Sequence, residues 1–435
     1  MKLHAAAQAL GAVAHGPDVE FTRVETDTRK LTPGCLFVAL KGENFDGHDY
    51  LDKALELGAA AVMVNAAHNT VHPALQVADT RLGLGQLAAW HRGQMPAKLA
   101  AITGSNGKTT VKEMLASICA AAAGAESVLA TAGNFNNDIG MPLTLLRLTP
   151  VHRYAVIEMG MNHAGELDYL TKLAQPDVAL VNNALRAHLG FFDSVEAIAR
   201  AKGEIYAGLK PGGIALINAD DPHAALWRDL NASRTVMTFG ASALADVRIE
   251  GEEQGSRSKV QGENPNTPLH LAPCSLHLNT PQGRIETTLN LPGEHNRRNA
   301  AAATALALAL GIAPNHIAAG LAACSGAKGR LQTHACLHGA TLIDDTYNAN
   351  PDSVLAAIQV LAARPGKRLL VLGDMGELGD TAPALHREVG EKAKAAGINR
   401  LFCLGELTQE TVKGFGAGGM HFERIEELLA EIEQA

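Results

Sequence analysis

A glycine-rich segment at residues 104–110 contains the residue types that bind a nucleoside triphosphate. It follows an apolar run at 98–103 and precedes a helical pattern over 108–123. Glycines let backbone N–H groups turn inward around phosphates, the lysine reaches the β- and γ-phosphates, and the next hydroxyl can bind Mg²⁺. A capped helix after a glycine turn would not need Lys-Thr-Thr at its start. The sequence therefore predicts that ATP is bound by Gly104, Ser105, Asn106, Gly107, Lys108, Thr109 and Thr110.

A carboxylate follows a second apolar run. Tyr154-Ala-Val-Ile ends in Glu158, as a Walker-B strand does when its acidic residue binds the metal. Many buried strands end in a glutamate at an exposed tip, so this pattern alone is weak. Beside a phosphate loop it makes Glu158 a candidate metal ligand.

The elements that position these residues alternate between strands and helices. Strands are predicted at 98–103, 154–159, 177–182 and 214–218, with a helix at 108–123. Such alternation predicts a mostly parallel sheet with helices on both faces.

The alternation resumes near the C-terminus. Strands are predicted at 341–345, 368–373 and 400–404, separated by helices at 352–362 and 384–396. This pattern is typical of a second, smaller doubly wound α/β domain.

The 435 residues exceed one ordinary core and suit about three domains. We predict an α/β protein with a small N-terminal α/β domain over 1–81, a central P-loop domain with a doubly wound, mostly parallel sheet over 82–312, and a Rossmann-like α/β domain over 313–435. Within the central domain, 250–268 is polar and predicts a loop, whereas 275–291 alternates around Pro-Gln-Gly and predicts a hairpin.

Composition restricts the function classes. The chain is 47% hydrophobic and 19% charged, as soluble globular proteins are, and its net charge of −8 argues against binding duplex DNA through a basic surface. The six cysteines are scattered without a CxxC pair, so reduced core thiols are expected. The Ala-rich run at 300–313 is too short for a membrane span, which needs ~20 apolar residues. The alanine-rich N-terminus favours an amphipathic helix over a signal peptide. We expect a cytoplasmic monomer without nucleic acid or membrane span.

Two further segments follow the acidic strand, Asn182 to His188 and Ala201-Lys202-Gly-Glu. Taken singly, they are read as a surface histidine and a solvated helix lysine. In this order after Glu158 they resemble the Mur ligase family, whose phosphate loop also lacks the glycine that the general pattern has at the position of Ile102. The resemblance covers the whole chain. It implies that His188 and a carbamylated Lys202 support a second Mg²⁺, and that the catalytic and metal-binding residues include Lys108, Thr109, Glu158, His188 and Lys202.

Three later segments also resemble the family. Gly293 to Asn299 is similar to its HNxxN segment, although an N-cap with a charged first turn would look alike. Gly-Arg-Leu at 329–331 resembles the family's phosphate-binding arginine, and 344–351 (Asp-Asp-Thr-Tyr-Asn-Ala-Asn-Pro) its nucleoside-binding segment. The resemblance implies that ATP is also bound by Asn296, Asn299, Arg330, Asp345, Tyr347 and Asn350.

The segments 133–140, 344–351 and 373–379 are most similar to the dipeptide-adding member, and no Asp-Asn-Pro-Arg string of the diaminopimelate-adding member occurs. Arg186 stands where family members differ. The two segments 27–29 and 41–48 resemble the family's UDP-sugar-binding domain. The resemblance implies that substrate is bound by Asp27, Thr28, Arg29, Lys41, Gly42, Asp46, His48, Asn134 and Asn137.

The implied activity is ATP-dependent amide-bond formation between D-alanyl-D-alanine and UDP-N-acetylmuramoyl-tripeptide through an acyl phosphate. Within the class, another Mur ligase or a folylpolyglutamate-type ligase is the alternative. From a different class, the alternative is a P-loop NTPase switch protein that uses ATP to change shape.

Overall fold

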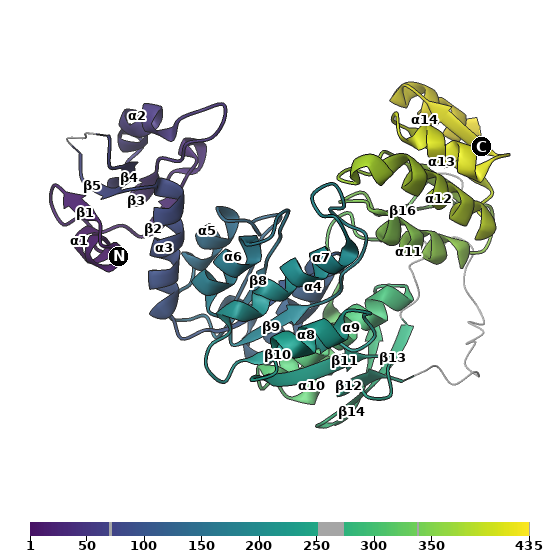
Figure 1. Cartoon of the computed structure of the whole chain (residues 1–435), viewed down its shortest axis with the longest axis horizontal. Helices are drawn as coiled ribbons and strands as arrows, with labels where there is room; N and C mark the ends of the chain where they lie inside the picture. Colours follow the sequence, from purple (N-terminus) through teal and green to yellow (C-terminus); the bar gives the residue numbers. More distant parts are fainter. Residues whose placement is uncertain (69–71, 251–273, 337–338, 435) are drawn as a thin grey trace.

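The computed structural model is elongated, and its three parts follow one another along the chain (Figure 1). It describes residues 1–68, 72–250, 274–336 and 339–434. The polar stretch predicted as a loop at 250–268 lies outside these residues, except for Glu250.

The N-terminal part is a small five-stranded sheet with strand order β1-β5-β4-β3-β2. The apolar runs of β3 and β4 are buried, and they pair in parallel, whereas β1 pairs antiparallel with β5 at one edge. Buried parallel strands are expected to be nearly continuous in apolar residues. The elements of this part are α1 (Leu3–Leu10), β1 (Val13–His15), β2 (Arg23–Glu25), β3 (Cys35–Val38), α2 (Leu51–Glu56), β4 (Ala61–Asn65) and β5 (Ala74–Val77).

The central part is built on a nine-stranded sheet with order β14-β13-β12-β11-β10-β9-β6-β8-β7. All its pairs from β7 to β12 are parallel, and β13 and β14 add an antiparallel hairpin at one edge, which confirms the hairpin prediction. The strands are β6 (Lys98–Thr103), β7 (Val128–Ala130), β8 (Tyr154–Glu158), β9 (Val178–Val181), β10 (Ile214–Asn218), β11 (Thr235–Gly240), β12 (Val247–Ile249), β13 (Cys274–Thr280) and β14 (Gly283–Leu289).

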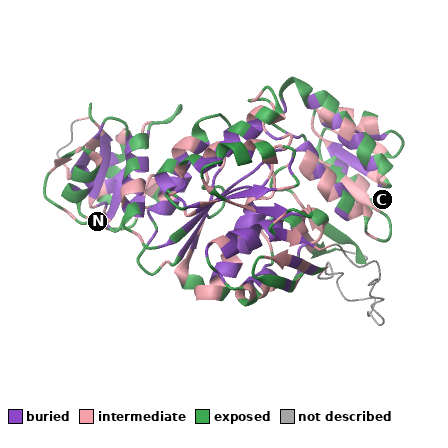
Figure 2. Cartoon of the chain, turned by 60° about the horizontal axis from the view of Figure 1, so that its bottom comes forward, coloured by how far each residue is buried: buried purple, intermediate pink, exposed green. Residues whose placement is uncertain are grey.

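Helices cover both faces of this sheet, and the strands between them are buried (Figure 2). Successive residues of β6 point to opposite faces: Leu99 and Ala101 join one hydrophobic cluster, whereas Ala100 and Ile102 join the other. The second cluster contains α4, α9 and α10, where the small alanines of α9 permit close packing. The helices are α3 (Thr80–Gly93), α4 (Lys108–Ala123), α5 (Gly140–Leu145), α6 (Glu166–Ala174), α7 (Val195–Gly203), α8 (Ala224–Leu230), α9 (Glu294–Ala309) and α10 (Pro314–Ala323).

Helix α10 belongs with this central core. Ile317 and Leu321 are fully buried in the cluster that contains α4, and Ser117 Oγ donates to Gly320 O at 2.7 Å. A Cβ on Gly320 would lie 2.3 Å from Ile118 Cα, so the two helices meet at backbone distance. The predicted boundary at 312 rests on the segment 311–314, which ends the Ala-rich helix; the next helix, α10, nevertheless packs its apolar face onto α4.

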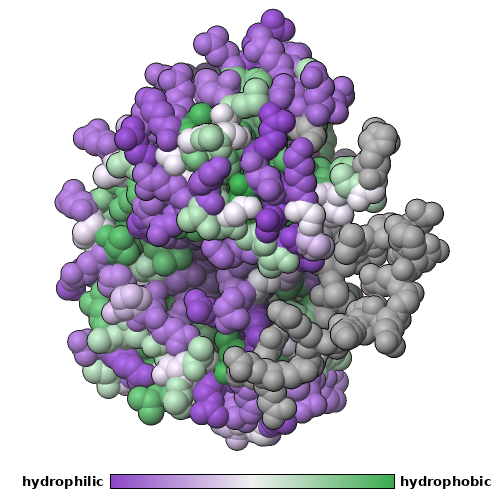
Figure 3. Space-filling model, turned by 90° about the vertical axis from the view of Figure 1, so that its right-hand side faces the viewer, coloured by the Kyte–Doolittle hydropathy of each residue, from purple (hydrophilic) through white to green (hydrophobic). Residues whose placement is uncertain are grey.

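The C-terminal part contains a parallel sheet, β17-β18-β19, and a separate antiparallel pair, β15-β16. The sequence predicted the 341–345 strand as a member of the parallel sheet; instead it pairs with β15, which a short connection favours. The face at this end of the molecule is mostly hydrophilic (Figure 3). The elements are β15 (Gln332–Ala335), β16 (Thr341–Asp344), α11 (Pro351–Ala362), β17 (Leu369–Leu372), α12 (Ala382–Ala395), β18 (Arg400–Leu404), α13 (Thr408–Phe415), β19 (Gly419–Phe422) and α14 (Ile425–Gln434).

Within the described ranges, no helix has both the length and the apolar character needed to cross a bilayer.

Candidate active site

The phosphate loop connects β6 to α4 at the carboxyl edge of the central sheet, as predicted. Gly104 and Gly107 have φ of 155° and 81°, backbone conformations that a side chain disfavours. Lys108 begins α4 and folds back, so that its Nζ donates to Gly104 O at 2.8 Å and Ser105 O at 3.4 Å. Burial lowers the pKa of Lys108, while the nearby Glu158 carboxylate acts in the opposite direction. The loop therefore surrounds the ammonium group of Lys108.

Two asparagines after β9 hold this loop from the neighbouring strand. Asn106 N donates to Asn183 Oδ1 at 2.9 Å, and Asn106 O accepts from Asn182 Nδ2 at 3.0 Å and Asn183 Nδ2 at 3.1 Å. Neither was predicted as a site residue, although both follow a parallel strand at its carboxyl end, where α/β sheets bind ligands.

The predicted residues of α9 lie directly behind the loop. Asn299 Oδ1 accepts from Asn182 Nδ2 at 3.0 Å, and Asn299 Nδ2 donates to Asn296 Oδ1 at 3.1 Å. Asn296 Nδ2 donates in turn to Pro292 O at 2.7 Å. This chain of amides is buried, so each side chain is held in one orientation.

The amide chain leaves no space for a side chain on the loop. A Cβ on Gly107 would lie 2.4 Å from Asn299 Oδ1 and 2.6 Å from Asn182 Nδ2. We expect Gly107→Ala to weaken ADP binding at least tenfold in calorimetry, because the loop or the amides must move. Gly212→Ala is the matched control: its φ of 77° is similar, yet nothing lies within 4 Å of the added Cβ. Equal ADP affinities in the two variants would mean that the close packing is irrelevant to binding.

Glu158 carries a carboxylate oxygen that has no hydrogen-bond partner in the described part of the chain. The side chain is buried; Oε1 accepts from Asn136 Nδ2 at 2.9 Å, while no hydrogen bond reaches Oε2 among the described residues. Buried carboxylate oxygens are normally satisfied, so an unpaired one is suited to a bound cation. The described residues contain no group of three or more His, Cys, Asp or Glu arranged around a metal. A metal here must therefore take other ligands as well.

His188 and Lys202 lie within electrostatic reach of Lys108. Burial is the main cause that lowers the pKa of His188, and the positive charges of Lys202 and Lys108 lower it further. Lys202 on α7 is 1% exposed, and burial together with Lys108 lowers its pKa well below the usual range. His188 Nδ1 lies 2.6 Å from Oε2 of Glu377, a C-terminal residue that sequence reasoning missed. The structure thus brings three predicted catalytic residues together.

Two cavities adjoin the phosphate loop, and Asn106, Gly107 and Arg330 line both. The smaller, of about 320 Å³, is lined by the predicted nucleotide residues Asn296, Asn299 and Asp345. The larger, of about 850 Å³, is lined by residues from the central and C-terminal parts: Lys108, Asn134, Asn137, Glu158, His188, Tyr347, Asn350 and Glu377.

The C-terminal contribution is partly pre-arranged. The Arg330 guanidinium lies 4.4 Å from the ring centroid of Tyr347, a cation–π contact. Burial raises the pKa of Asp345, whose Oδ1 accepts from Leu331 N at 3.2 Å. Arg330 Nε is buried without a hydrogen-bond partner among the described residues, so this guanidinium has a donor left for an anionic ligand.

The predicted substrate asparagines lie on the loop before α5. Asn137 Oδ1 accepts from Gly140 N at 2.8 Å, so this side chain also holds the start of the helix. Asn134 and Asn137 both face the larger cavity. Arg81 of α3 is paired with Asp138 of the same loop.

The predicted N-terminal residues lie on two turns and line neither cavity. In the first turn, Arg29 pairs with Asp27 at 2.8 Å, and its hydrogen bonds lower the pKa of Asp27 to about 2. In the second, Asp46 lies 2.6 Å from His48 Nδ1 and 3.7 Å from Lys41 Nζ. Thr28 and Gly42 lie in the same two turns. The structure thus separates Asp27, Thr28, Arg29, Lys41, Gly42, Asp46 and His48 from the phosphate loop.

Comparisons with known proteins match each part of the chain. Family models described as the Mur ligase family catalytic domain, the Mur ligase middle domain and the Mur ligase glutamate ligase domain match residues 20–92, 102–307 and 329–435. The UDP-N-acetylmuramoyl-tripeptide--D-alanyl-D-alanine ligase of Escherichia coli (strain K12) is 45% identical over 98% of this chain and 90% of its own length.

Solved structures agree with these matches. A crystal structure of MurF from Acinetobacter baumannii has a TM-score of 0.89 at 38% identity, covering 99% of this chain and 91% of that one. MurF ligase from Thermotoga maritima, in complex with ADP, has a TM-score of 0.80 at 26% identity, covering 95% and 91%. The three-part α/β architecture and the coverage of nearly the whole chain establish that this protein belongs to the Mur ligase family.

Proposed function

We propose that this chain is an ADP-forming ligase that joins D-alanyl-D-alanine to UDP-N-acetylmuramoyl-tripeptide. The observation that carries the proposal is the pair of cavities that meet at the phosphate loop, one suited to a nucleotide and one large enough for two peptide substrates. The name of the Escherichia coli relative supports the choice of substrates.

The reaction needs a carboxylate to become an electrophile. ATP transfers its γ-phosphoryl group to the terminal carboxylate of the tripeptide, which gives an acyl phosphate and ADP. The amine of D-alanyl-D-alanine then attacks the acyl carbon, a proton leaves the nitrogen, and phosphate departs from the tetrahedral intermediate. Two anions must approach each other in the first step, so Lys108 at the loop and Arg330 at both cavities lower the electrostatic barrier.

ATP has a defined place in this scheme. Its phosphates fit the loop from Gly104 to Thr110, and its nucleoside fits the smaller cavity, where Asp345 can accept from the ribose. The Thermotoga maritima relative was crystallised with ADP, which supports nucleotide use. The remaining protein contribution is positioning of substrates that come from different parts of the chain.

Mg²⁺ fits the same site. We propose that Thr109 and Glu158 would hold one ion, since Glu158 Oε2 is buried without a hydrogen-bond partner among the described residues, and that His188 and carbamylated Lys202 would support a second. When bound, Mg²⁺ supplies positive charge to the phosphoryl oxygens.

One assay decides between the proposed function and its alternatives. We expect ADP to form from ATP and UDP-N-acetylmuramoyl-tripeptide only when D-alanyl-D-alanine is also present in turnover conditions. Stimulation by another amino acid or by a folate acceptor instead would identify a different ligase of the class. ATP turnover indifferent to every acceptor would favour a P-loop switch protein.

The N-terminal part is proposed to supply affinity for the UDP sugar and little for ATP. Its predicted residues lie outside both cavities, on two turns where Arg29 and Lys41 are exposed and His48 is largely buried. Replacing Arg29 and His48 together by alanine is expected to weaken UDP-tripeptide binding about tenfold in calorimetry and leave ADP binding unchanged, given ~1.4 kcal/mol for two lost polar contacts.

A control pair of the same residue types lies on the β13–β14 hairpin, where Arg284 Nη2 and His277 Nδ1 are 2.8 Å apart. Alanine at both of these positions should change neither affinity. If ADP binding weakens in the Arg29 and His48 variant while the UDP substrate is unaffected, the domain assignment is wrong.

We further propose that the enzyme is a monomer that works in the cytoplasm, where ATP is available. Light scattering of the purified chain and fractionation of cells test the two statements separately.

A further inference from the structure

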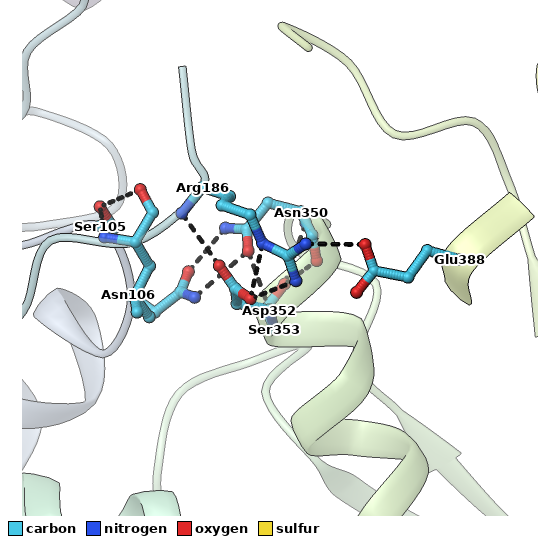
Figure 4. Close-up of polar contacts among 8 residues, drawn as sticks. Ser105, Asn106, Arg186, Asn350, Asp352, Ser353 and Glu388 are labelled. Atoms are coloured by element: carbon cyan, nitrogen blue, oxygen red, sulfur yellow. Dashed lines mark hydrogen bonds and ion pairs between the residues drawn. The ribbon is translucent and has the colours of Figure 1, made fainter. Parts of the chain in front are cut away.

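The loop between β9 and α7 joins the central part to the C-terminal part through Arg186 (Figure 4). Arg186 Nη2 and Nε donate to Asp352 Oδ1 at 2.7 and 3.1 Å, and its backbone N donates to Asp352 Oδ2 at 2.9 Å. Arg186 Nη1 donates to Glu388 Oε2 at 2.8 Å. One residue therefore binds both α11 and α12 of the C-terminal part.

The central end of this connection is fixed to the phosphate loop. Leu185, the residue before Arg186, donates its N–H to Ser105 Oγ at 2.9 Å and accepts from the same hydroxyl at 3.2 Å. Ala184 N donates to Asp221 Oδ2 at 3.0 Å. A movement of Arg186 would thus be transmitted directly to the loop that binds phosphate.

The C-terminal end returns to the same loop. Asn350 caps α11 by accepting from Ser353 N at 3.0 Å, and Asp352 lies in the first turn of that helix. Asn350 Nδ2 donates to Asn106 Oδ1 at 2.6 Å, and Asn106 Nδ2 donates to Asn350 Oδ1 at 3.2 Å. The contacts therefore form a closed ring from the phosphate loop through Arg186 and α11 back to the phosphate loop (Figure 4).

The ion pairs in this ring are only partly open to solvent. The side chains of Arg186, Asp352 and Glu388 are 29%, 21% and 33% exposed. The hydrogen bonds to Asp352 raise the pKa of Arg186 further. Charge-assisted, forked bonds of arginine also fix direction, which a lysine ammonium does not.

We propose that Arg186 is a positioning residue that sets the C-terminal part in register against the phosphate loop. Through Asp352 it orients the first turn of α11, so that Asn350 meets Asn106 while Arg330 and Asp345 line the nucleotide cavity. This inference deepens the proposed function, because it assigns the assembly of the ATP site to an ion pair between two parts of the chain.

The test is a double-mutant cycle of Arg186→Ala and Asp352→Asn. Each single variant is expected to lower kcat/KM for ATP about tenfold, within the usual range of coupling between sites, while the KM for the UDP substrate changes less than twofold. The double variant should resemble Arg186→Ala, because both substitutions act on the same Arg186–Asp352 contact and Arg186→Ala also removes the pair with Glu388. Amide exchange of Ser353 and Val354, both bonded to Asn350, should accelerate in all three.

Arg400→Ala is the matched control. Arg400 pairs with Glu431 at 2.9 Å and is similarly exposed, at 28%, but its ion pair stays within the C-terminal part. It should leave kcat/KM for ATP unchanged. If Arg186→Ala does not fold, Arg186→Lys keeps the charge without the fork and should show the same selective loss for ATP.

Two results would overturn the inference: unchanged kcat/KM for ATP in folded Arg186→Ala, or losses that multiply in the double variant. ADP affinity and amide exchange can both be measured without any ligation reaction. A wild-type chain that binds ADP but ligates nothing would contradict the proposed function, and the same exchange measurement would still decide the role of Arg186.

Discussion

Lys108→Ala is expected to lower ligation by about a thousandfold, the loss seen when a preorganised charge on a transition state is removed. Lys108 Nζ lies inside the phosphate loop, 2.8 Å from Gly104 O, and the same side chain lines the larger cavity beside Glu158. Its ammonium is the cation that the loop offers to the transferring phosphoryl group. In the alanine variant the negative charge of that group is left uncompensated by the loop. The measurement is ADP release and dipeptide incorporation by the purified variant.

The control separates loss of charge at the site from loss of folding. Lys172→Ala removes a surface lysine that pairs with Asp168 at 2.7 Å one helical turn away, and it should ligate at the wild-type rate. Thermal unfolding of Lys108→Ala should remain cooperative, since its hydrogen bonds are confined to the loop. Ligation near the wild-type rate in Lys108→Ala would refute the phosphate-loop assignment.

The phosphate loop was predictable because its information is local. The predicted strand at 98–103 and helix at 108–123 coincide with β6 and α4, since an apolar run, a glycine turn and a helical pattern follow one another without interruption. Strand β10 was predicted with its observed bounds for the same reason. The carboxyl-edge position of Glu158 followed from its place at the end of an apolar strand.

The contacts between parts of the chain were not predictable, because no local pattern encodes them. Arg186 and Asp352 are 166 residues apart in sequence, and neither stands in a spacing that indicates the other. The contact of His188 with Glu377 also joins residues far apart in the sequence. Both residues have a positive φ, 62° and 61°, a conformation that a sequence pattern rarely predicts for residues other than glycine. The pairing of β16 with β15 was likewise not predictable, because hydrophobic periodicity indicates a strand but does not indicate which strand it pairs with.

Lys202 is expected to carry a carbamate in the active enzyme. The side chain is 1% exposed. Lys108 and His188 are its electrostatic neighbours, so a second ammonium there is opposed by burial and by like charge. Burial lowers the pKa of Lys202, and the neutral amine is the form that reacts with CO₂. The product is an anion with the loss of one proton, which suits both the cationic neighbours and a bound metal.

Chemical rescue tests this expectation. Lys202→Ala should lose about a thousandfold in ligation, comparable with Lys108→Ala, because a ligand for the metal charge is missing. Short-chain carboxylates added to the assay should restore part of that activity, since they can occupy the vacated position with an anionic group. Lys108→Ala is the matched control: its missing group is a cation, so the same carboxylates should restore nothing. A fully active Lys202→Ala enzyme would remove both the residue and the modification from the mechanism, whereas loss without rescue would contradict the carbamate and leave Lys202 as a structural requirement.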